Sequence, residues 1–273
     1  MNQTEMLALI QKVELDAIKE FRKICGEHGI DFFLRGGSVL GAVKYNGFIP
    51  WDDDMDVAIP REGYDRLPTI FKDRIIAGKY QVLCYQYSDS LHCYFPRLFL
   101  LEDERKRLGL PRNTNLGLHL IDIIPLDGAP NNSILRRFYF AKVYWYRFLA
   151  SLGTTYVGDH VDMHSPKQKM IIGLFKKIGF AKIFPQNSVY ARLDRLYKKY
   201  DWHKQKYAGT INASLFAKEV MPSEIWGQGV MMPFEDTEFR VPTDFDNYLK
   251  RLYGENYRYE EPSDDEKKSH LGG

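Results

Sequence analysis

The sequence has few cysteines, no long apolar run and no excess of charge of one sign. Its three cysteines form no C-x-x-C pair, which predicts reduced thiols in a cytoplasmic protein. No apolar stretch reaches the roughly 18 residues that span a bilayer, and the N-terminus lacks a secretory pattern. The formal net charge of +2 argues against nucleic acid as a partner. Any basic surface must therefore be local.

A zinc site is one alternative use of the scarce cysteines. Cys84, His92, Cys93 and His119 together offer four suitable ligands. Their spacing matches no zinc template, so this interpretation stays in the background.

The composition is otherwise that of a globular protein. The chain has 273 residues, of which 44% are apolar and 27% charged. That length allows one large domain or two modest ones around a substantial core.

Hydrophobic periodicity predicts a mixture of helices and strands. Helices are expected over 4–25, with Thr4 as N-cap, over 61–76, through much of 133–200 and over 245–253. Strands are expected over 30–34, 55–59, 80–87, 93–101 and 118–124, with short strands within 219–239. The charged segment 102–115 is expected to be a loop.

The segment Gly36-Gly37-Ser38 offers backbone N–H groups and a hydroxyl where the chain turns sharply. Such a turn is a suitable cradle for phosphate oxygens. Arg35 and Lys44 flank it and are candidates for neutralising phosphate charge. Asn46-Gly47 signals a tight turn, so a hairpin is expected between this segment and the acidic residues that follow.

Asp54 and Asp56 alternate with apolar residues at the start of a predicted strand. Alternate side chains of a strand share a face, so these two carboxylates are expected to project together. Like charges on one face need a cation or a shared proton. An EF-hand in this register would want glycine at Val57 and a carboxylate at Gly63, which excludes a calcium loop.

A plain acidic turn at the solvent is the alternative for this cluster. Trp51 before the acids and apolar residues after them instead place the carboxylates at the edge of a core. Asp122 is the best third carboxylate, because an aspartate inside an apolar strand is costly without a partner. That partner is either a metal or a cation such as Arg97. Asp127 is expected to cap a turn rather than to bind metal.

These motifs resemble the signature of the LicD family. The similar segments are Leu34–Lys44, Gly47–Val57, Ile121–Gly128 and, near the end, Val241-Pro242 with Tyr248–Gly254. The family includes bacterial phosphocholine transferases, and fukutin and fukutin-related protein are distant relatives. Residues from about 131 to 215 show no motif to match.

The resemblance implies an α/β (α+β) fold, a nucleotidyltransferase-like mixed-sheet core with an inserted helical region. It implies that Gly36, Gly37 and Ser38 hold phosphates, and that Asp54, Asp56 and Asp122 bind Mg²⁺, or Mn²⁺ in its place. Asp52 also fits the family's pattern of alternating acids, as a metal ligand, as a base or as a residue that hydrogen-bonds a ligand. Among the carboxylates, Asp122 is the preferred proton acceptor, although the sequence does not decide this.

The activity implied is transfer of phosphocholine, or a similar phospho-alcohol, from CDP-choline or another CDP-alcohol to a sugar hydroxyl. The acceptor would be a cell-surface glycan such as lipopolysaccharide or teichoic acid, or its lipid-linked precursor. Two alternatives remain open. One is a nucleotidyltransferase that leaves a nucleotide on its acceptor, and the other is a non-catalytic metal-binding module.

Three regions are expected along the chain. Residues 1–130 would form the catalytic core, 131–215 a helical insertion, and 216–273 a segment that packs back on the core, with a mobile tail from about 260. Segments 133–150 and 166–184 mix cations with large apolar residues. They are expected either to pack as amphipathic helices on the core or to contact a membrane peripherally, at the inner face of the cell membrane.

Overall fold

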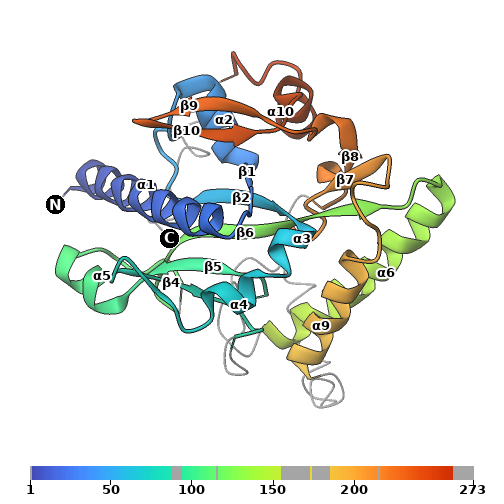
Figure 1. Ribbon diagram of the computed structural model, residues 1–273, viewed down its shortest axis with the longest axis horizontal. Coiled ribbons are helices and arrows are strands. Elements are labelled where there is room, and N and C mark those ends of the chain that lie inside the picture. The colour runs from blue at the N-terminus through green and yellow to red at the C-terminus, as the bar shows by residue number, and fades with distance from the viewer. Residues whose placement is uncertain are drawn as a thin grey trace.

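The computed structural model describes residues 2–87, 94–114, 116–154, 173, 185–213 and 216–260 (Figure 1). The described helices are α1 (Gln3–Glu27), α2 (Gly36–Tyr45), α3 (Arg61–Tyr64), α4 (Leu67–Phe71), α5 (Glu102–Leu108), α6 (Ser133–Thr154), α9 (Gln186–Tyr197), α10 (Phe245–Tyr253) and the 3-10 turns η2 (Phe216–Glu219) and η3 (Ser223–Ile225). The strands are β1 (Phe33–Leu34), β2 (Met55–Pro60), β3 (Ile75–Ile76), β4 (Tyr80–Leu83), β5 (Arg97–Leu100), β6 (Leu118–Ala129), β7 (Tyr207–Gly209), β8 (Met221–Pro222), β9 (Val230–Phe234) and β10 (Thr237–Val241).

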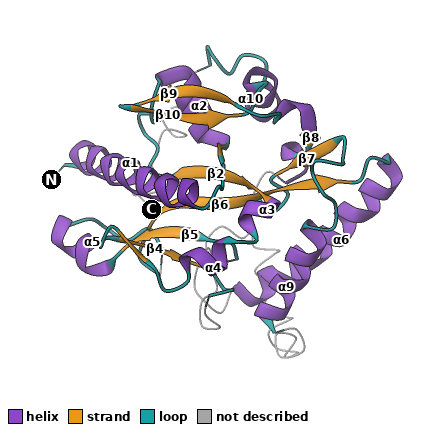
Figure 2. Ribbon diagram, viewed as in Figure 1, coloured by secondary structure: helices purple, strands orange, loops and turns teal. Residues whose placement is uncertain are grey.

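The main sheet has the strand order β1-β2-β6-β5-β4-β3 (Figure 2). Strands β2 and β6 pair in parallel, and the other neighbours on this path are antiparallel. Beyond the part that pairs with β5, the long strand β6 also pairs with β7, which in turn pairs with β8. The expected mixed α/β fold is thus confirmed.

A second layer forms around the hairpin of β9 and β10. These two strands pair with each other, and α2 and α10 lie beside them at the top of the molecule (Figure 1). The helix predicted over 245–253 is confirmed as α10. Asp244 begins it by accepting a hydrogen bond from Asn247 N–H through its side chain.

Helix α1 crosses one face of the main sheet (Figure 1). Its buried residues include Ile10, Ala17 and Phe21, at the spacing of one helix face. The N-cap lies two residues before the expected cap at Thr4. Asn2 is the N-cap, and with Glu5 it forms a reciprocal capping box that satisfies both backbone N–H groups.

The segment from Gly36 to Tyr45 is a helix, not the expected turn and hairpin. Gly36 has a φ of 53°, a left-handed conformation that glycine adopts at little cost. Its role is to let the extended chain at Arg35 turn into α2. Asn46, also left-handed, ends the helix. The glycine pair was mistaken for a loop because it lies in the first turn.

The charged segment after β5 was expected to be a loop but begins with α5. Three acidic residues occupy its first turn and three basic residues its last, which complements the helix dipole. Arg105 and Arg107 pair with Glu102 and Glu104 three residues earlier. No residue of α5 is buried, so it has no apolar periodicity by which to recognise it.

Helices α6 and α9 run side by side at the right of the molecule (Figure 1). They share a hydrophobic cluster of their own, which includes Val143, Tyr190 and Leu193. The chain then returns to the main sheet through β7. Most of 166–184, the second basic segment, lies outside the described residues, as does the tail after residue 260. The three-region division stays a prediction.

Asp127 is buried inside β6 and does not cap a turn. Arg61 at the start of α3 donates two hydrogen bonds to its carboxylate, at 2.7 and 2.6 Å. The same guanidinium donates to Asp194 of α9 at 2.7 Å. Arg61 therefore ties the helical pair to the sheet. No helix in the described ranges is both long and apolar enough to cross a membrane.

Candidate active site

Four of the predicted site residues line one pocket, which we call the aspartate pocket. Arg35, Asp54, Asp56 and Asp122 contribute to its wall, and its volume is about 420 Å³. They come from the start of α2, from β2 with the residue before it, and from β6. Segments far apart in the sequence thus meet here.

Strand register brings the pocket's charges together. Asp56 lies opposite Asp122 in the parallel pairing of β2 and β6. Arg97 lies opposite Asp122 in the antiparallel pairing of β5 and β6. Met55 and Val57, on either side of Asp56, are buried in the core. Asp54 and Asp56 both line the pocket, as the alternation predicts.

Asp54 has no cation to balance its charge among the described residues. Burial, and then repulsion from Asp56 and Asp52, raises the pKa of Asp54 well above its usual range. Burial also raises the pKa of Asp56 to about 6, although Arg35 acts in the opposite direction. An ionised Asp54 is therefore unfavourable in the metal-free pocket.

Arg35 is the centre of a buried network beside the pocket. Its Nη1 lies 2.9 Å from Asp56 Oδ2, and its Nη2 donates to both oxygens of Glu219 at 2.7 and 2.8 Å. Glu219 is fully buried and also accepts a hydrogen bond from Thr210 Oγ1. Arg35 therefore holds the orientation of Asp56 rather than facing solvent as a simple phosphate-binding cation.

Asp122 lies at the pocket and also beside the arginine that was weighed as its partner. Arg97 Nε is 3.0 Å from Asp122 Oδ1, and His119 Nε2 is 2.7 Å from the same oxygen. Burial alone would raise the pKa of Asp122, but Arg97 and His119 outweigh it and lower the pKa to about 2. Asp122 therefore stays ionised.

The predicted phosphate cradle, Gly36 to Ser38, packs against Asp52 and Asp56. Ser38 Oγ accepts a hydrogen bond from Asp56 N–H at 2.9 Å. A Cβ on Gly36 would lie 3.2 Å from Asp56 Oδ2, and one on Gly37 would lie 3.1 Å from Asp52 Oδ2. The missing side chains thus let α2 approach both carboxylates closely. Lys44, in the last turn of α2, donates to Glu260 O and does not line the pocket.

Asp52 and Glu14 lie close enough to influence the pocket without lining it. Asp52 contributes to raising the pKa of Asp54 and of Asp56. Glu14 of α1 is fully buried with both carboxylate oxygens unpartnered. Burial, and then repulsion from Asp54 and Asp52, raises its pKa well above the usual range. Sequence reasoning missed Glu14, because it lies within the periodic helical pattern of α1.

One part of the pocket lining was missed entirely by sequence reasoning. It is formed by the residues Tyr94, Phe95, Arg147, Tyr190 and Asn212. Arg147 of α6 donates to the carbonyl oxygens of 211, 212 and 213, at 3.3, 3.1 and 3.1 Å. This holds the loop that presents Asn212. Only 6% of Asn212 is exposed, yet its Oδ1 has no hydrogen-bond partner.

The oxygen-only donor set of Asp54, Asp56 and Asp122 suits Mg²⁺ or Mn²⁺. The uncompensated charge of Asp54 is the observation that favours a cation here. In the described ranges, no three His, Cys, Asp or Glu side chains already stand in a metal-binding arrangement. Asp56 and Asp122 are instead turned toward Arg35 and Arg97.

The alternative zinc site gains no support. Cys84 is a buried cysteine outside any disulfide, in the cluster beneath α6 and α9, whereas His119 lies beside Asp122. His92 and Cys93 lie outside the described residues.

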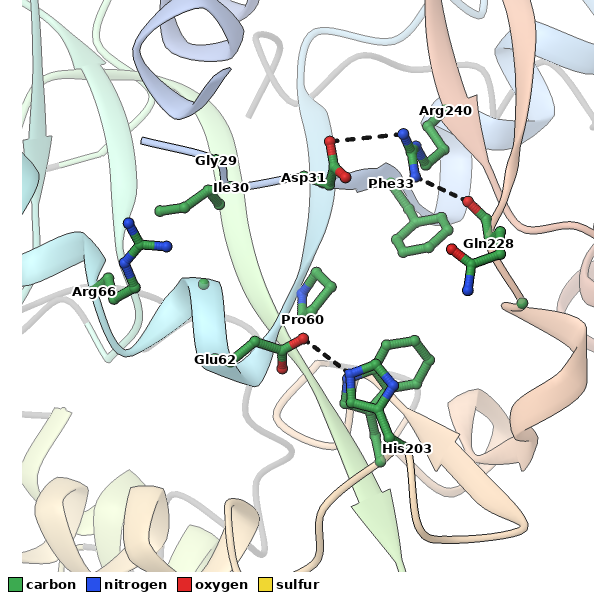
Figure 3. Close-up of a pocket in the computed structure, with 13 residues that line it drawn as sticks. Gly29, Ile30, Asp31, Phe33, Pro60, Glu62, Arg66, His203, Gln228 and Arg240 are labelled. Carbon is green, nitrogen blue, oxygen red and sulfur yellow. Dashed lines mark hydrogen bonds and ion pairs between the residues drawn. The ribbon is translucent and has the colours of Figure 1, made fainter. Parts of the chain in front are cut away.

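A second cavity, of about 210 Å³, opens beside β1 and α3 (Figure 3). Both of its carboxylates face a basic side chain. Glu62 faces His203 at 3.0 Å, and Asp31 faces Arg240 at 3.6 Å. Arg240 also donates to the carbonyl oxygen of Gln228. Because neither carboxylate of this cavity lacks a partner, the aspartate pocket is the stronger candidate.

Comparison with known proteins agrees with the motifs. Residues 29–91, which carry Gly36 to Asp56, match the family model described as LicD/FKTN/FKRP, nucleotidyltransferase domain. The chain is 25% identical over 280 residues to the lipopolysaccharide cholinephosphotransferase LicD of Haemophilus influenzae, covering 96% of this chain and 94% of that protein. It is also 32% identical over 73 residues to an uncharacterised protein of Rickettsia typhi, 24% of each chain. The resemblance to the LicD family that the motifs indicated is therefore confirmed.

Proposed function

We propose that this protein is a phosphotransferase that moves phosphocholine from CDP-choline to a sugar hydroxyl of a surface glycan or its lipid-linked precursor. The observation that carries the proposal is the convergence of Asp54, Asp56 and Asp122 at one pocket, in a chain similar to a lipopolysaccharide cholinephosphotransferase over nearly its full length. A CDP-alcohol with another headgroup is the nearest variant of this donor.

Asp54, Asp56 and Asp122 would hold Mg²⁺ in the aspartate pocket. The ion would supply positive charge against the diphosphate of the donor, which must be neutralised before an oxygen nucleophile can approach. Loading requires Asp56 and Asp122 to share their oxygens with the ion instead of only with Arg35 and Arg97. The released guanidinium N–H groups would then be available to phosphate oxygens.

The bond changes are simple. The acceptor hydroxyl oxygen forms a bond to the phosphorus that carries choline, the bond between that phosphorus and the bridging oxygen breaks, and CMP leaves with the electron pair. A carboxylate takes the hydroxyl proton. Asp122, the proton acceptor preferred from the sequence, lines the aspartate pocket and stays the candidate for this role.

The direct test is CMP release. The full chain, CDP-choline, Mg²⁺ and a lipopolysaccharide or teichoic acid acceptor should yield CMP and a choline-bearing glycan, and EDTA should stop both. CDP-ribitol and CDP-glycerol in parallel reactions identify the headgroup. If no CDP-alcohol yields CMP with any acceptor in Mg²⁺ or Mn²⁺, the proposal fails.

The products also separate the two alternative functions. A nucleotidyltransferase would leave the cytidine base on the acceptor and release phosphocholine. A non-catalytic module would bind Mg²⁺ but show no affinity for CDP-choline in calorimetry.

Asn212 is expected to contribute to substrate binding. Replacing Asn212 with alanine should lower kcat/KM for the donor or the acceptor by about threefold to tenfold, the value of a hydrogen bond to an uncharged group. The loss of thermal stability should be small, a few degrees at most, because the buried amide oxygen has no partner to lose. Steady-state kinetics and a melting curve measure both effects.

The matched control for this variant is Asn131→Ala. The Asn131 side chain is exposed and accepts a hydrogen bond from Lys206 N–H, outside the aspartate pocket. Its kinetics should equal those of the wild type. Unchanged kinetics in Asn212→Ala would mean that the orphaned amide faces no substrate.

A further inference from the structure

One exposed apolar surface remains without a role in the proposed chemistry. The described residues expose ten large hydrophobic side chains, and five of them lie on α6. These five are Ile134, Leu135, Phe138, Tyr144 and Trp145. Phe138 is 71% exposed and Ile134 61% exposed, so these side chains are not slightly uncovered core residues. A patch of this kind marks an interaction surface.

The exposed residues form a continuous line along the helix. Ile134, Phe138, Ala141 and Trp145 are separated by four, three and four residues, which places them on one face. We call this line the apolar stripe. The opposite face carries Tyr139 and Val143, which are buried against α9 and the sheet. Helix α6 is therefore apolar on two faces, and the described residues cover only one of them.

The charges of α6 are all positive. Its sequence contains no Asp or Glu and four basic residues. Two of these are engaged by the protein: Arg136 donates to the carbonyl oxygen of Pro130 and lies over the Tyr207 ring, and Arg147 holds the loop of 211–213. The other two, Arg137 and Lys142, are exposed and adjoin the apolar stripe. Neither has an ion pair within the described chain.

This combination selects one kind of partner. Aromatic and aliphatic side chains that project outward, flanked by exposed cations and free of acids, match an anionic bilayer surface. The apolar stripe would enter the boundary between headgroups and acyl chains. Arg137 and Lys142 would lie at its edges, where long cationic side chains reach lipid phosphates.

The same helix reaches the aspartate pocket. Arg147, Ala150 and Ser151, near its C-terminal end, line that pocket, whereas the apolar stripe occupies its first three turns. We infer that α6 docks this protein on an anionic membrane surface through Ile134, Phe138 and Trp145, with Arg137 and Lys142 at the headgroups. Docking would bring the pocket within reach of a lipid-linked acceptor, a consequence that rests on the proposed function; the binding itself does not.

The test is flotation of the full chain with vesicles, without substrate. Wild type should float with vesicles of phosphatidylglycerol and phosphatidylcholine at low salt, and much less with phosphatidylcholine alone. Replacing both Phe138 and Trp145 with serine should reduce the partition coefficient by about tenfold or more. Arg137→Glu with Lys142→Glu should have an effect of similar size, since each cation near the surface contributes about fivefold.

Matched controls are available elsewhere on the surface. Ile75→Ser with Tyr259→Ser removes two other exposed hydrophobic side chains. Lys23→Glu with Lys72→Glu makes the same change in net charge at exposed sites outside α6. Both control variants should float as the wild type does. Because all these side chains are exposed, melting temperatures should stay within a few degrees of wild type.

Insertion of the apolar stripe into the bilayer can be measured separately by fluorescence quenching. Lipids brominated in the acyl chain should quench Trp145 fluorescence in the wild type, and Trp145→Phe should remove most of that quenching while still floating. The inference is overturned if wild type ignores anionic vesicles, or if the α6 and control variants float equally. It is also overturned if wild type ignores vesicles and sediments as a dimer that the Phe138 and Trp145 double variant dissociates. CMP release is assayed separately, so either hypothesis can fail alone.

Discussion

Replacing Asp54 with asparagine is expected to abolish phosphotransfer and to stabilise the metal-free protein. Activity should fall by about 100-fold or more, because the variant loses a ligand and a charge that Mg²⁺ needs. Without metal, however, Asp54 is repelled by Asp56 and Asp52 and has no cation partner among the described residues. Removing that repulsion should raise the melting temperature in EDTA by about 2–4 °C.

The measurement is thermal unfolding in EDTA and with increasing Mg²⁺. Wild type should gain stability from Mg²⁺, since a ligand that binds only the folded state shifts the equilibrium by mass action. Asp54→Asn should have a higher melting temperature than the wild type in EDTA, and added Mg²⁺ should raise it little. Asp103→Asn on α5, an exposed carboxylate that is outside the pocket, is the control and should gain as the wild type does. If Asp54→Asn were less stable than the wild type in EDTA, the metal-free wild type would already be free of the repulsion between Asp54 and its neighbouring carboxylates.

The pH dependence of stability has a definite sign in the metal-free protein. The pKa of Asp56 is raised to about 6, and those of Asp54 and Glu14 are also raised, so the folded state binds more protons than the unfolded state above about pH 4. The unfolding free energy in EDTA should therefore fall as pH rises from about 4 through about 6. Asp54→Asn should make this fall shallower.

The sequence predicted those site residues whose position follows from the pattern of residues within a single strand. Alternation around Met55 placed Asp54 and Asp56 on one face, and an aspartate within an apolar strand singled out Asp122. Parallel pairing of β2 and β6 then brings Asp56 opposite Asp122. Local patterns were wrong about secondary structure here, because the glycines that begin α2 resemble a turn.

The parts that the sequence did not predict depend on contacts between distant segments. Glu219 is 184 residues from Arg35, and nothing in its neighbourhood marks it as the partner of a buried guanidinium. Asn212 likewise depends on a distant residue. Arg147 of α6 donates a hydrogen bond to its carbonyl oxygen and so holds its loop at the pocket. Such residues have no spacing rule, because burial and pairing arise only when the sheet and the helical pair meet.

Replacing Arg35 with methionine is expected to be the most destabilising change at the site. It leaves Glu219 fully buried and Asp56 half-buried without their shared cation. Breaking a buried ion pair by removing one partner typically costs about 3–5 kcal/mol. That is a large share of the roughly 5–15 kcal/mol that keeps a protein of this kind folded. Chemical denaturation in EDTA measures the loss.

The double variant Arg35→Met, Glu219→Met separates pairing from packing. With both charges gone, the buried position is filled by apolar side chains, so much of the lost stability should return. If the double variant is as unstable as the sum of the two single variants, the contribution of Arg35 is its packing and not its charge.

Arg61→Met provides the matched control away from the pocket. Arg61 has 11% of its side chain exposed and holds a fully buried aspartate, Asp127, through two hydrogen bonds, so a similar loss of stability is expected. The two variants should differ in their response to Mg²⁺. In Arg35→Met the ion can replace the missing positive charge beside Asp56, and Mg²⁺ should restore more stability than it adds to the wild type. In Arg61→Met the gain should equal that of wild type, because Asp127 lies outside the aspartate pocket. Equal gains in both variants would mean that Arg35 supports the fold without compensating charge at the metal site.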